Sequence, residues 1–382
     1  MLSSVEPALF IFWFSLVILL MGYVIYPVFM IMVSHLVPEK RYKTGRLPSV
    51  SIIIPAYNEE EVIRRKIDNT LSLDYPEEKV EIIIVSDASE DGTDDIVKEY
   101  VSDRLILVRQ EERQGKLEAL NRGAGVASGE VLVFTDANTI VERDALEKLV
   151  LPFVDPRVGA VAGEQIISKE GGAAKGEGLY WRLEGKLKEA ESRLGSVIGA
   201  DGSMYSIRKE LYPNFRAKAI VMDDFIISTS VITRGYKLEY APDAHSYEGA
   251  SKNMWIEFRR KARIFAGSAG SISLVLKLLL KPFVFKLILH KFIRWFSPFL
   301  LITLFISNIF LISYGLFYKA ILVAQCIFYG LSIVGLAIEL SGMPHSRLTY
   351  FPLYFTMTNV AEVYGLIGMI AGRYKPAWKK LR

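Results

Sequence analysis

The sequence predicts an α/β domain with a mostly parallel sheet, joined to α-helical membrane segments. Short apolar stretches alternate with helical patterns through the middle of the chain, as in parallel sheets. Residues 8–34 are almost uninterrupted apolar sequence, long enough to cross a bilayer. Residues 40–265 have the charge density of a soluble domain. Three more apolar runs follow them, near 296–317, 320–340 and 350–371. The 382-residue chain is therefore expected to be a multi-pass membrane protein with one soluble domain.

Residues 131–140 are the centre of the predicted domain. The run 131–134 is wholly apolar and predicts a strand buried on both faces, and Asp136 and Asn138 follow its end. Ligands bind at the carboxyl ends of strands in α/β sheets, so both side chains are expected in a cleft. Two oxygen donors at i and i+2 suit a hard divalent cation that also carries substrate phosphates. The alternative is a polar strand-to-turn junction that the asparagine stabilises.

The other elements are assigned by the same patterns. A strand over 50–55 ends at Pro55, and Asn58 is expected to cap a helix that extends to about residue 73. Gly115 and Lys116 begin another helix. The further strands are expected over 80–85, 104–108, 158–162 and 237–240, and the further helices over 177–194 and 225–233.

Polar or acidic residues end three of these strands, near residues 55, 86 and 135. Their convergence at one sheet edge predicts a nucleotide site. The glycines fit neither the dinucleotide fingerprint nor a P-loop, which argues against an oxidoreductase and a kinase-like ATPase. The only cysteine, Cys326, and four scattered histidines argue against disulfides and a zinc cluster. A net charge of +4 gives no indication of nucleic acid, and no nucleic-acid partner is expected.

The charges that flank the first apolar run predict its orientation. Residues 1–7 contain Glu6 and no Lys or Arg, whereas 39–46 are strongly basic. The positive-inside rule then places the N-terminus outside and the soluble domain in the cytoplasm of a plasma or inner membrane. No positive charge precedes the run and no small-residue cleavage site follows it, so it is not expected to be a cleavable signal peptide.

Five segments of the soluble part resemble glycosyltransferase family 2 in order and spacing. They are Ile-Ile-Ile-Pro-Ala-Tyr-Asn-Glu-Glu (52–60), Val-Ser-Asp-Ala-Ser-Glu-Asp-Gly-Thr (85–93), Gly-Lys-Leu-Glu-Ala-Leu-Asn-Arg-Gly (115–123), Phe-Thr-Asp-Ala-Asn-Thr (134–139) and Asp-Asp (223–224). The resemblance covers roughly residues 48–270. With the membrane segments, the chain looks like the branch of hyaluronan, chitin, cellulose and poly-N-acetylglucosamine synthases. The resemblance implies a GT-A fold that binds a nucleoside-diphosphate sugar, expected to be UDP-linked.

The resemblance also assigns the donor site residue by residue. The residues that match the loop around the base and ribose are Pro55, Ala56, Tyr57, Asn58 and Glu59. Asp87 matches the acid that contacts the uracil or ribose, and Lys116 matches a basic residue near the diphosphate. A helix N-terminus favours anions, which supports this role for Lys116 over that of a solvated lysine.

Asp136 and Asn138 match the Asp-x-Asp metal site of the family, with asparagine as its second residue. Asparagine keeps a carbonyl oxygen and loses a charge, so Asp136 is the main expected ligand of Mg²⁺ or Mn²⁺. The cation would neutralise charge on the departing diphosphate. Asp223 and Asp224 match the acidic pair of the family, with Asp224 as general base and Asp223 in support. Such a single displacement inverts the anomeric configuration. The alternative for the pair is simple helix capping.

The acceptor is expected near Gly199 and Asp201, and near Arg260 and Arg263. Processive relatives carry Gln-x-x-Arg-Trp on a helix at the membrane surface, whereas this chain has Arg-Lys-Ala-Arg-Ile at 260–264. Arg263 keeps the arginine that can stabilise a diphosphate. The missing tryptophan removes an aromatic platform for a sugar and weakens the case for polymer synthesis. A basic helix lying on anionic lipid is the alternative.

Lys286, His290 and Arg294 fall at i, i+4 and i+8 of an otherwise apolar helix. This pattern predicts an interfacial helix in the cytoplasmic leaflet, with its basic side chains at the headgroups. Three spans after it place the C-terminus outside, but the basic tail at 372–382 argues for the inside, which we favour. The predicted units are a membrane helix (1–38), the GT-A domain (39–270), interfacial helices (271–295), about three membrane helices (296–372) and a basic tail (373–382).

The leading hypothesis is an inverting, metal-dependent glycosyltransferase that makes and secretes a β-linked polysaccharide at the membrane. The alternative is transfer of one sugar to a lipid-linked acceptor. A transporter with a cytosolic nucleotide sensor is less favoured, because the spans contain few charges and no visible inverted repeat. An inactive scaffold is disfavoured because Asp87, Asp136 and Asp224 are all retained.

Overall fold

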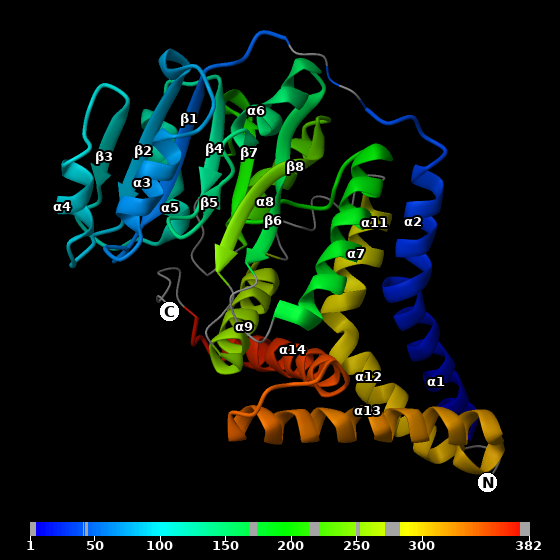
Figure 1. Cartoon of the computed structure of the whole chain (residues 1–382). Helices are drawn as coiled ribbons and strands as arrows, with labels where there is room; N and C mark the ends of the chain where they lie inside the picture. Colours follow the sequence, from blue (N-terminus) through cyan, green and yellow to red (C-terminus); the bar gives the residue numbers. More distant parts are fainter. Residues whose placement is uncertain are drawn as a thin grey trace.

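The computed structural model describes residues 5–40, 42, 45–168, 174–213, 222–249, 253–271 and 283–374. The soluble part is built on one eight-stranded sheet with the order β3-β2-β1-β4-β7-β6-β8-β5 (Figure 1). Its strands are β1 (Val50–Ala56), β2 (Val80–Ser86), β3 (Leu105–Arg109), β4 (Val131–Thr135), β5 (Ile140–Val141), β6 (Val158–Ser168), β7 (Met204–Arg208) and β8 (Lys237–Gly249).

The first four strands in this order, β3-β2-β1-β4, are parallel, and the second half of the sheet is mixed. β7 lies antiparallel between β4 and β6, whereas β6 and β8 pair in parallel. The predicted fold class is therefore confirmed. β5 and β7 were not predicted. β5 has only two residues, and β7 follows the glycine-containing loop directly, so neither gives a clear strand pattern.

Helices cover both faces of the sheet. They are α3 (Ile63–Leu71), α4 (Thr93–Lys98), α5 (Lys116–Val126), α6 (Ala145–Val150), α7 (Ala174–Arg193) and α8 (Asp223–Thr233). A further helix, α9 (Met254–Gly270), packs against α14 (Arg347–Ile370) instead. In β1, Ile53 packs into the core with α5 and α8, whereas Ile52 and Ile54 pack into the core with α3 and α6. Burial on both faces explains why β1 and β4 are continuous apolar runs.

The predicted cap at Asn58 is wrong. Helix α3 begins at Ile63, and Asn58 adopts a left-handed conformation with φ of 53°. Its Oδ1 instead accepts a hydrogen bond of 2.9 Å from the amide of Glu90. Asparagine tolerates this conformation better than most residues. A side chain that often caps helices therefore also suits a loop that is hydrogen-bonded to another loop.

Four helical segments among the described residues are long and apolar enough to cross a membrane. They are Val5–Ser34, Val284–Tyr314, Leu316–Ser341 and Arg347–Ile370. The first contains α1 (Val5–Leu20), a π-helical turn and α2 (Tyr26–Ser34). The second contains α11 (Val284–Lys286), a π-helical turn and α12 (Ile293–Leu311), and the last two are α13 and α14. The first two stand beside α7, and α14 lies next to α9 (Figure 1).

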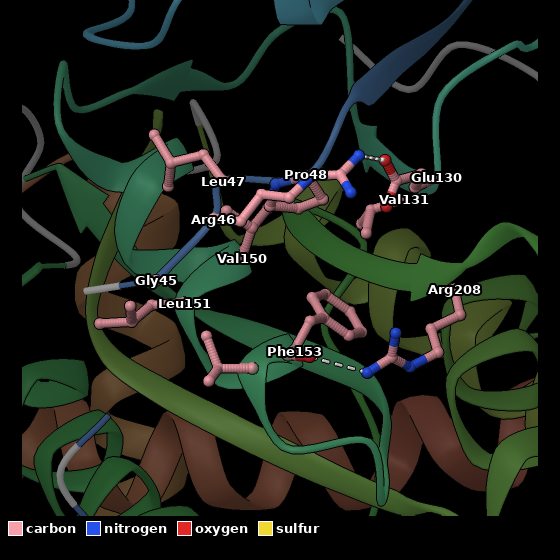
Figure 2. A pocket seen from close by; sticks show the side chains of 11 residues that line it. Gly45, Arg46, Leu47, Pro48, Glu130, Val131, Val150, Leu151, Phe153 and Arg208 are labelled. Carbon is pink, nitrogen blue, oxygen red and sulfur yellow. Dashed lines mark hydrogen bonds and ion pairs between the residues drawn. The ribbon is translucent and has the colours of Figure 1, made fainter. Parts of the chain in front are cut away.

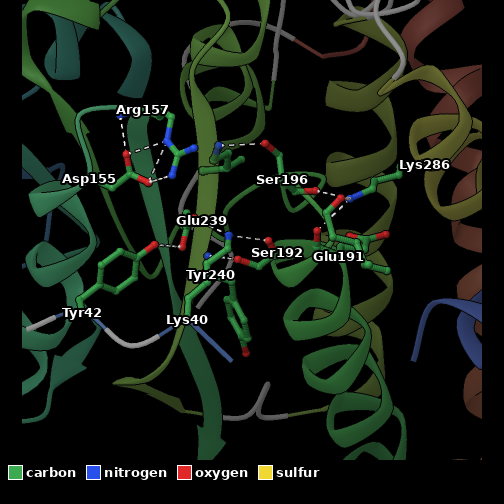
Figure 3. Close-up of polar contacts among 12 residues, drawn as sticks. Lys40, Tyr42, Asp155, Arg157, Glu191, Ser192, Ser196, Glu239, Tyr240 and Lys286 are labelled. Atoms are coloured by element: carbon green, nitrogen blue, oxygen red, sulfur yellow. Dashed lines mark hydrogen bonds and ion pairs between the residues drawn. The ribbon is translucent and has the colours of Figure 1, made fainter. Parts of the chain in front are cut away.

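The basic residues predicted to face headgroups instead contact α7. His290 lies between Glu184 and Glu191, with nitrogen-to-oxygen distances of 2.7 and 2.8 Å. Arg294 pairs with Glu184 at 2.7 Å, and the Lys286 ammonium donates to the backbone carbonyl of Glu191 (Figure 3). The expectation that these three side chains reach the headgroups was therefore wrong. Their partners lie about one hundred residues away in the sequence, and helical periodicity does not reveal such distant partners. Residues 272–282 of the predicted interfacial segment lie outside the described residues.

The segment between α2 and β1 is anchored to the sheet. The Tyr42 hydroxyl and the Lys40 ammonium both bind the carboxylate of Glu239 in β8, at 2.6 and 2.5 Å (Figure 3). Further along, residues 45–48 line a hollow of about 110 Å³ beside Phe153 and Arg208 (Figure 2). This hollow lies where β1 and β4 begin, at the opposite end from the predicted nucleotide site.

Candidate active site

Four charged side chains meet near the carboxyl end of β4. Asp136 follows β4, Lys116 is the first residue of α5, and Asp223 and Asp224 open α8. The Lys116 Nζ lies 2.8 Å from Asp136 Oδ1 and 3.3 Å from Asp223 Oδ2. Segments more than one hundred residues apart therefore place three carboxylates and one ammonium in a single cluster.

Gly202 faces the middle of this cluster. A Cβ atom at this position would lie 3.3 Å from Lys116 Nζ, 3.5 Å from Asp224 Oδ2 and 3.6 Å from Asp136 Oδ2. The missing side chain thus leaves space between the charged groups. Gly202 belongs to the loop 199–202, which was expected to face the acceptor and whose glycines allow a close approach to the backbone.

Charge and burial shift the protonation equilibria of the cluster. Burial lowers the pKa of Lys116, but the carboxylates of Asp136, Asp223 and Asp224 outweigh it, so its pKa is raised. Burial, followed by the neighbouring charge of Asp223, raises the pKa of Asp224 to about 7, against the opposing effect of Lys116. A carboxyl group with a pKa near neutrality is well suited to accept a proton at physiological pH.

Asp87 organises the loop that delivers Lys116. Its carboxylate accepts hydrogen bonds from the backbone amides of Gln114 and Gly115, at 2.7 and 2.9 Å, and from Gln110 Nε2 at 2.7 Å. Gly115 has a φ of 96°, a conformation that glycine adopts at little cost. Asp87 is only 1% exposed, so its observed role is to hold this loop, with Gln110 as a partner that the sequence analysis missed.

The loop predicted to surround the base follows the buried end of β1, which contains Pro55 and Ala56. The backbone amide of Glu59 donates to Thr93 Oγ1 at 2.8 Å, which ties this loop to the start of α4. The Arg113 guanidinium lies 3.7 Å from the ring centre of Tyr57. Arg113 was missed, because no sequence pattern places it beside a residue 56 positions earlier.

Asp136 and Asn138 fit a hard cation whose other ligands come from a substrate and from water. The Asp136 side chain is 35% exposed, and its carboxylate faces the cluster. Asn138 donates its amide to Glu248 Oε1 at 3.0 Å, which leaves the carbonyl oxygen as its ligand atom. No group of three or more His, Cys, Asp or Glu suited to a metal occurs among the described residues. Mg²⁺ characteristically uses one or two carboxylates and completes its shell with phosphates and water.

The residues predicted at the acceptor have different surroundings. Gly199 packs against the ring of Phe225, because a Cβ there would lie 2.6 Å from its Cδ2 atom. Asp201 pairs with Lys188 of α7, a nearly buried lysine that the sequence analysis missed. Arg260 donates two hydrogen bonds to Glu257 within α9, at 2.8 and 3.0 Å.

Arg263 extends the charged cluster from the side of α9. Burial lowers its pKa, whereas the carboxylates of Asp136 and Asp223 act in the opposite direction. Both acids belong to the charged cluster described above, so Arg263 lies close enough to that cluster to interact with its charges. Of the two predicted α9 arginines, Arg263 thus interacts electrostatically with the cluster, whereas Arg260 is hydrogen-bonded within its own helix.

Residues 51–215 match the family model for glycosyl transferase family 2. The poly-beta-1,6-N-acetyl-D-glucosamine synthase of Staphylococcus aureus (strain COL) is 31% identical over an alignment of 218 residues that covers 53% of this chain and 52% of that protein. The chain thus matches about half the length of this curated relative. The probable glycosyltransferase YdaM of Bacillus subtilis is 28% identical over 88% of this chain and 86% of that protein.

Among solved structures, the mannosyltransferase PcManGT from Pyrobaculum calidifontis, in complex with GDP-Man and Mn²⁺, has the same fold. The two superpose with a TM-score of 0.68 at 24% identity, over 95% of this chain and 99% of that one. The matched family region contains β1 to β4, together with Lys116 at the start of α5 and Asp136 after β4. Residues 51–215 therefore form a glycosyltransferase family 2 region, and the chain is distantly related to the poly-β-1,6-N-acetylglucosamine synthases.

Proposed function

We propose that the protein is an inverting, metal-dependent transferase that moves a sugar from a nucleoside-diphosphate sugar to an acceptor at the membrane. The observation that carries this proposal is the cluster of Lys116, Asp136, Asp223 and Asp224 around Gly202. It combines a cation for phosphate, a carboxylate for a metal ion and a carboxyl group with a near-neutral pKa. Those are the groups that a direct displacement at an anomeric carbon requires.

Each group has a distinct task in this mechanism. Lys116 and Arg263 bind the diphosphate in this mechanism. Both cations interact electrostatically with Asp136, the proposed metal ligand, so they lie on the side of the site where the diphosphate would bind. Asp136, with Asn138 as a second oxygen ligand, would hold Mg²⁺ or Mn²⁺, which acts as a Lewis acid toward the leaving diphosphate. Asp224 takes the proton of the acceptor hydroxyl as that oxygen attacks. Asp223 supports Asp224 by pairing with Lys116.

The donor base is proposed to lie on the Tyr57–Arg113 pair. The Arg113 guanidinium lies 3.7 Å from the ring centre of Tyr57 and offers a flat surface for stacking beside the loop that follows β1. The relation to poly-β-1,6-N-acetylglucosamine synthase favours a UDP-sugar, whereas the complex of PcManGT contains GDP-mannose. Both nucleotides therefore belong in the test.

We propose a polysaccharide as the product, on the relation to the synthase of Staphylococcus aureus. A second candidate is transfer of one sugar to a lipid-linked acceptor. It is favoured by Ile264 in place of the tryptophan of processive relatives and by Arg260, which is bound to Glu257. The protein is proposed to lie in the plasma or inner membrane with its catalytic domain in the cytoplasm, as the basic segment after the first span indicates.

The test uses the full-length protein in nanodiscs, incubated with radiolabelled UDP- and GDP-sugars and Mn²⁺, with Asp224→Asn as the control. Labelled product that is absent from the control would support the proposal and identify the sugar. High-molecular-weight product would indicate a polymerase, and short lipid-extractable product would indicate single transfer. Equal label transfer by both proteins, or none from any donor, would contradict it.

The activity is expected to rise with pH between about pH 6 and 8. The active form of a general base is the ionised one, and the pKa of Asp224 is raised to about 7, so ionisation is completed across this interval. The measurement is kcat/KM for the donor across this range at saturating metal. A rate that is flat or falls with increasing pH would contradict the assignment of Asp224 as base.

Replacement of Gly365 by leucine is expected to lower activity by about tenfold or more, because a misplacement of about 1 Å in a group that binds the substrate can cost about 10²-fold in rate. Gly365 of α14 lies against the backbone of α9, where a Cβ would be 2.3 Å from the carbonyl oxygen of Ala262. The added side chain must push back the turn of α9 that carries Arg263. Gly330→Leu is the matched control in α13, because a Cβ there meets nothing within 4 Å. Equal activities of the two folded variants would contradict the prediction.

A further inference from the structure

Lys66 is a buried lysine that the mechanism above does not use. It lies in α3 with no exposed surface, and its Nζ donates to Thr135 Oγ1 at 2.9 Å and to the Thr139 carbonyl at 2.8 Å. Lysines are almost never fully buried unless they are paired. Both hydrogen-bond partners of this ammonium are uncharged groups, and they stand on either side of Asp136 and Asn138.

Asn69, three residues later on the same helix, binds the segment beyond the turn. Its Nδ2 donates to the Val141 carbonyl, and its Oδ1 accepts from the Val141 amide, both at 2.8 Å. Residues three apart on a helix share a face, so Lys66 and Asn69 act from one side. Within the turn, the amide of Thr139 donates to the Asp136 carbonyl at 3.1 Å. The turn is therefore closed internally and held to α3 on both sides.

The start of α3 is bound to the other half of the donor site. The amides of Val62 and Ile63 donate to the Glu59 carbonyl at 3.0 and 2.9 Å, and Glu59 itself is 6% exposed. Glu59 belongs to the loop proposed to surround the nucleoside, and Lys66 lies two helical turns further along. Helix α3 thus links the nucleoside loop to the turn that carries Asp136.

We propose that Lys66, with Asn69, is a positioning residue for the divalent-cation site. It holds the 136–138 turn so that the oxygens of Asp136 and Asn138 are placed where they would hold Mg²⁺ or Mn²⁺. This inference rests on the proposed function, since it concerns the metal site of that reaction. Groups that orient metal ligands from behind characteristically change metal affinity by about 10–100-fold when they are removed.

Direct Mn²⁺ binding tests this role separately from catalysis. The full-length protein in nanodiscs would be titrated with Mn²⁺ in the presence of UDP and, separately, GDP, with free Mn²⁺ followed by electron paramagnetic resonance. Lys66→Met keeps an apolar stem of similar length, and Asn69→Ala removes the second anchor. We expect both variants to bind Mn²⁺ about tenfold more weakly or worse. Arg65→Met is the matched control, because Arg65 is exposed on the same helix, and it should stay within about twofold of the wild type.

A purely structural role would give a different pattern. A positioning role predicts that the apparent Mn²⁺ activation constant of Asn69→Ala rises while kcat recovers at saturating Mn²⁺. A lower melting temperature with unchanged Mn²⁺ affinity, in either variant, would overturn the inference. If Lys66→Met does not fold, Asn69→Ala decides alone. Failure of the wild-type protein to bind Mn²⁺ with either nucleotide would overturn the proposed metal site and this inference together, whereas wild-type binding that both variants retain would overturn the inference alone.

Discussion

Asp224→Asn is expected to lower kcat by about 10²–10⁴-fold with little change in the KM for the donor. Asparagine keeps the shape of the side chain and its hydrogen bond from the amide of Phe225, which Asp224 accepts at 2.8 Å. It cannot take a proton from an attacking hydroxyl. The substitution therefore removes an interaction made in the transition state and leaves ground-state binding of the donor in place.

The measurement is steady-state release of the nucleoside diphosphate, with Asp243→Asn as the matched control. Asp243 is an exposed acid in β8 outside the charged cluster, and its loss is expected to change kcat by less than about twofold. Retention of most of the wild-type kcat by Asp224→Asn would transfer the base role to another group, with the adjacent Asp223 as the first candidate.

Lys116→Met is expected to lower kcat/KM by about 10²-fold or more, because it removes a cation that binds the diphosphate. It also leaves Asp136, Asp223 and Asp224 together without the ammonium that pairs with the first two. Lys116 lowers the pKa of Asp224, so its removal should move the rising limb of the pH profile to higher pH.

Both effects of Lys116→Met can be read from kcat/KM profiles of the variant and of Lys98→Met. Lys98 is an exposed lysine at the end of α4, with 62% of its side chain accessible. A fall in kcat/KM with no alkaline shift would show that Lys116 binds the donor without tuning Asp224. A shift to lower pH would contradict the electrostatic account of the cluster.

The parallel half of the sheet was predictable because its strands are buried on both faces. β1 and β4 are therefore nearly continuous apolar runs. The end of β4 also located Asp136, whereas Lys116 was assigned from the resemblance and from its place at a helix N-terminus. The antiparallel strand β7 was missed, since its place between β4 and β6 is set by pairing with strands that are distant in sequence.

Partners that are far apart in the chain account for the remaining differences. His290 and Arg294 gave a pattern typical of a lipid-facing helix, yet their partner Glu184 lies in the soluble domain. Lys66 reads as an ordinary lysine of an amphipathic helix, and only the fold places it behind the 136–138 turn. Helical periodicity indicates which face of a helix is polar, but it does not indicate what that face contacts.

The most direct test of the central claim is the anomeric configuration of the transferred sugar. The wild-type protein in nanodiscs would be supplied with the ¹³C-labelled α-linked donor that the activity panel identifies, and the one-bond carbon–proton coupling at the anomeric carbon of the product would be measured by NMR. A single displacement with Asp224 as base predicts a β-linked product. An α-linked product would contradict the inverting mechanism and the role of Asp224.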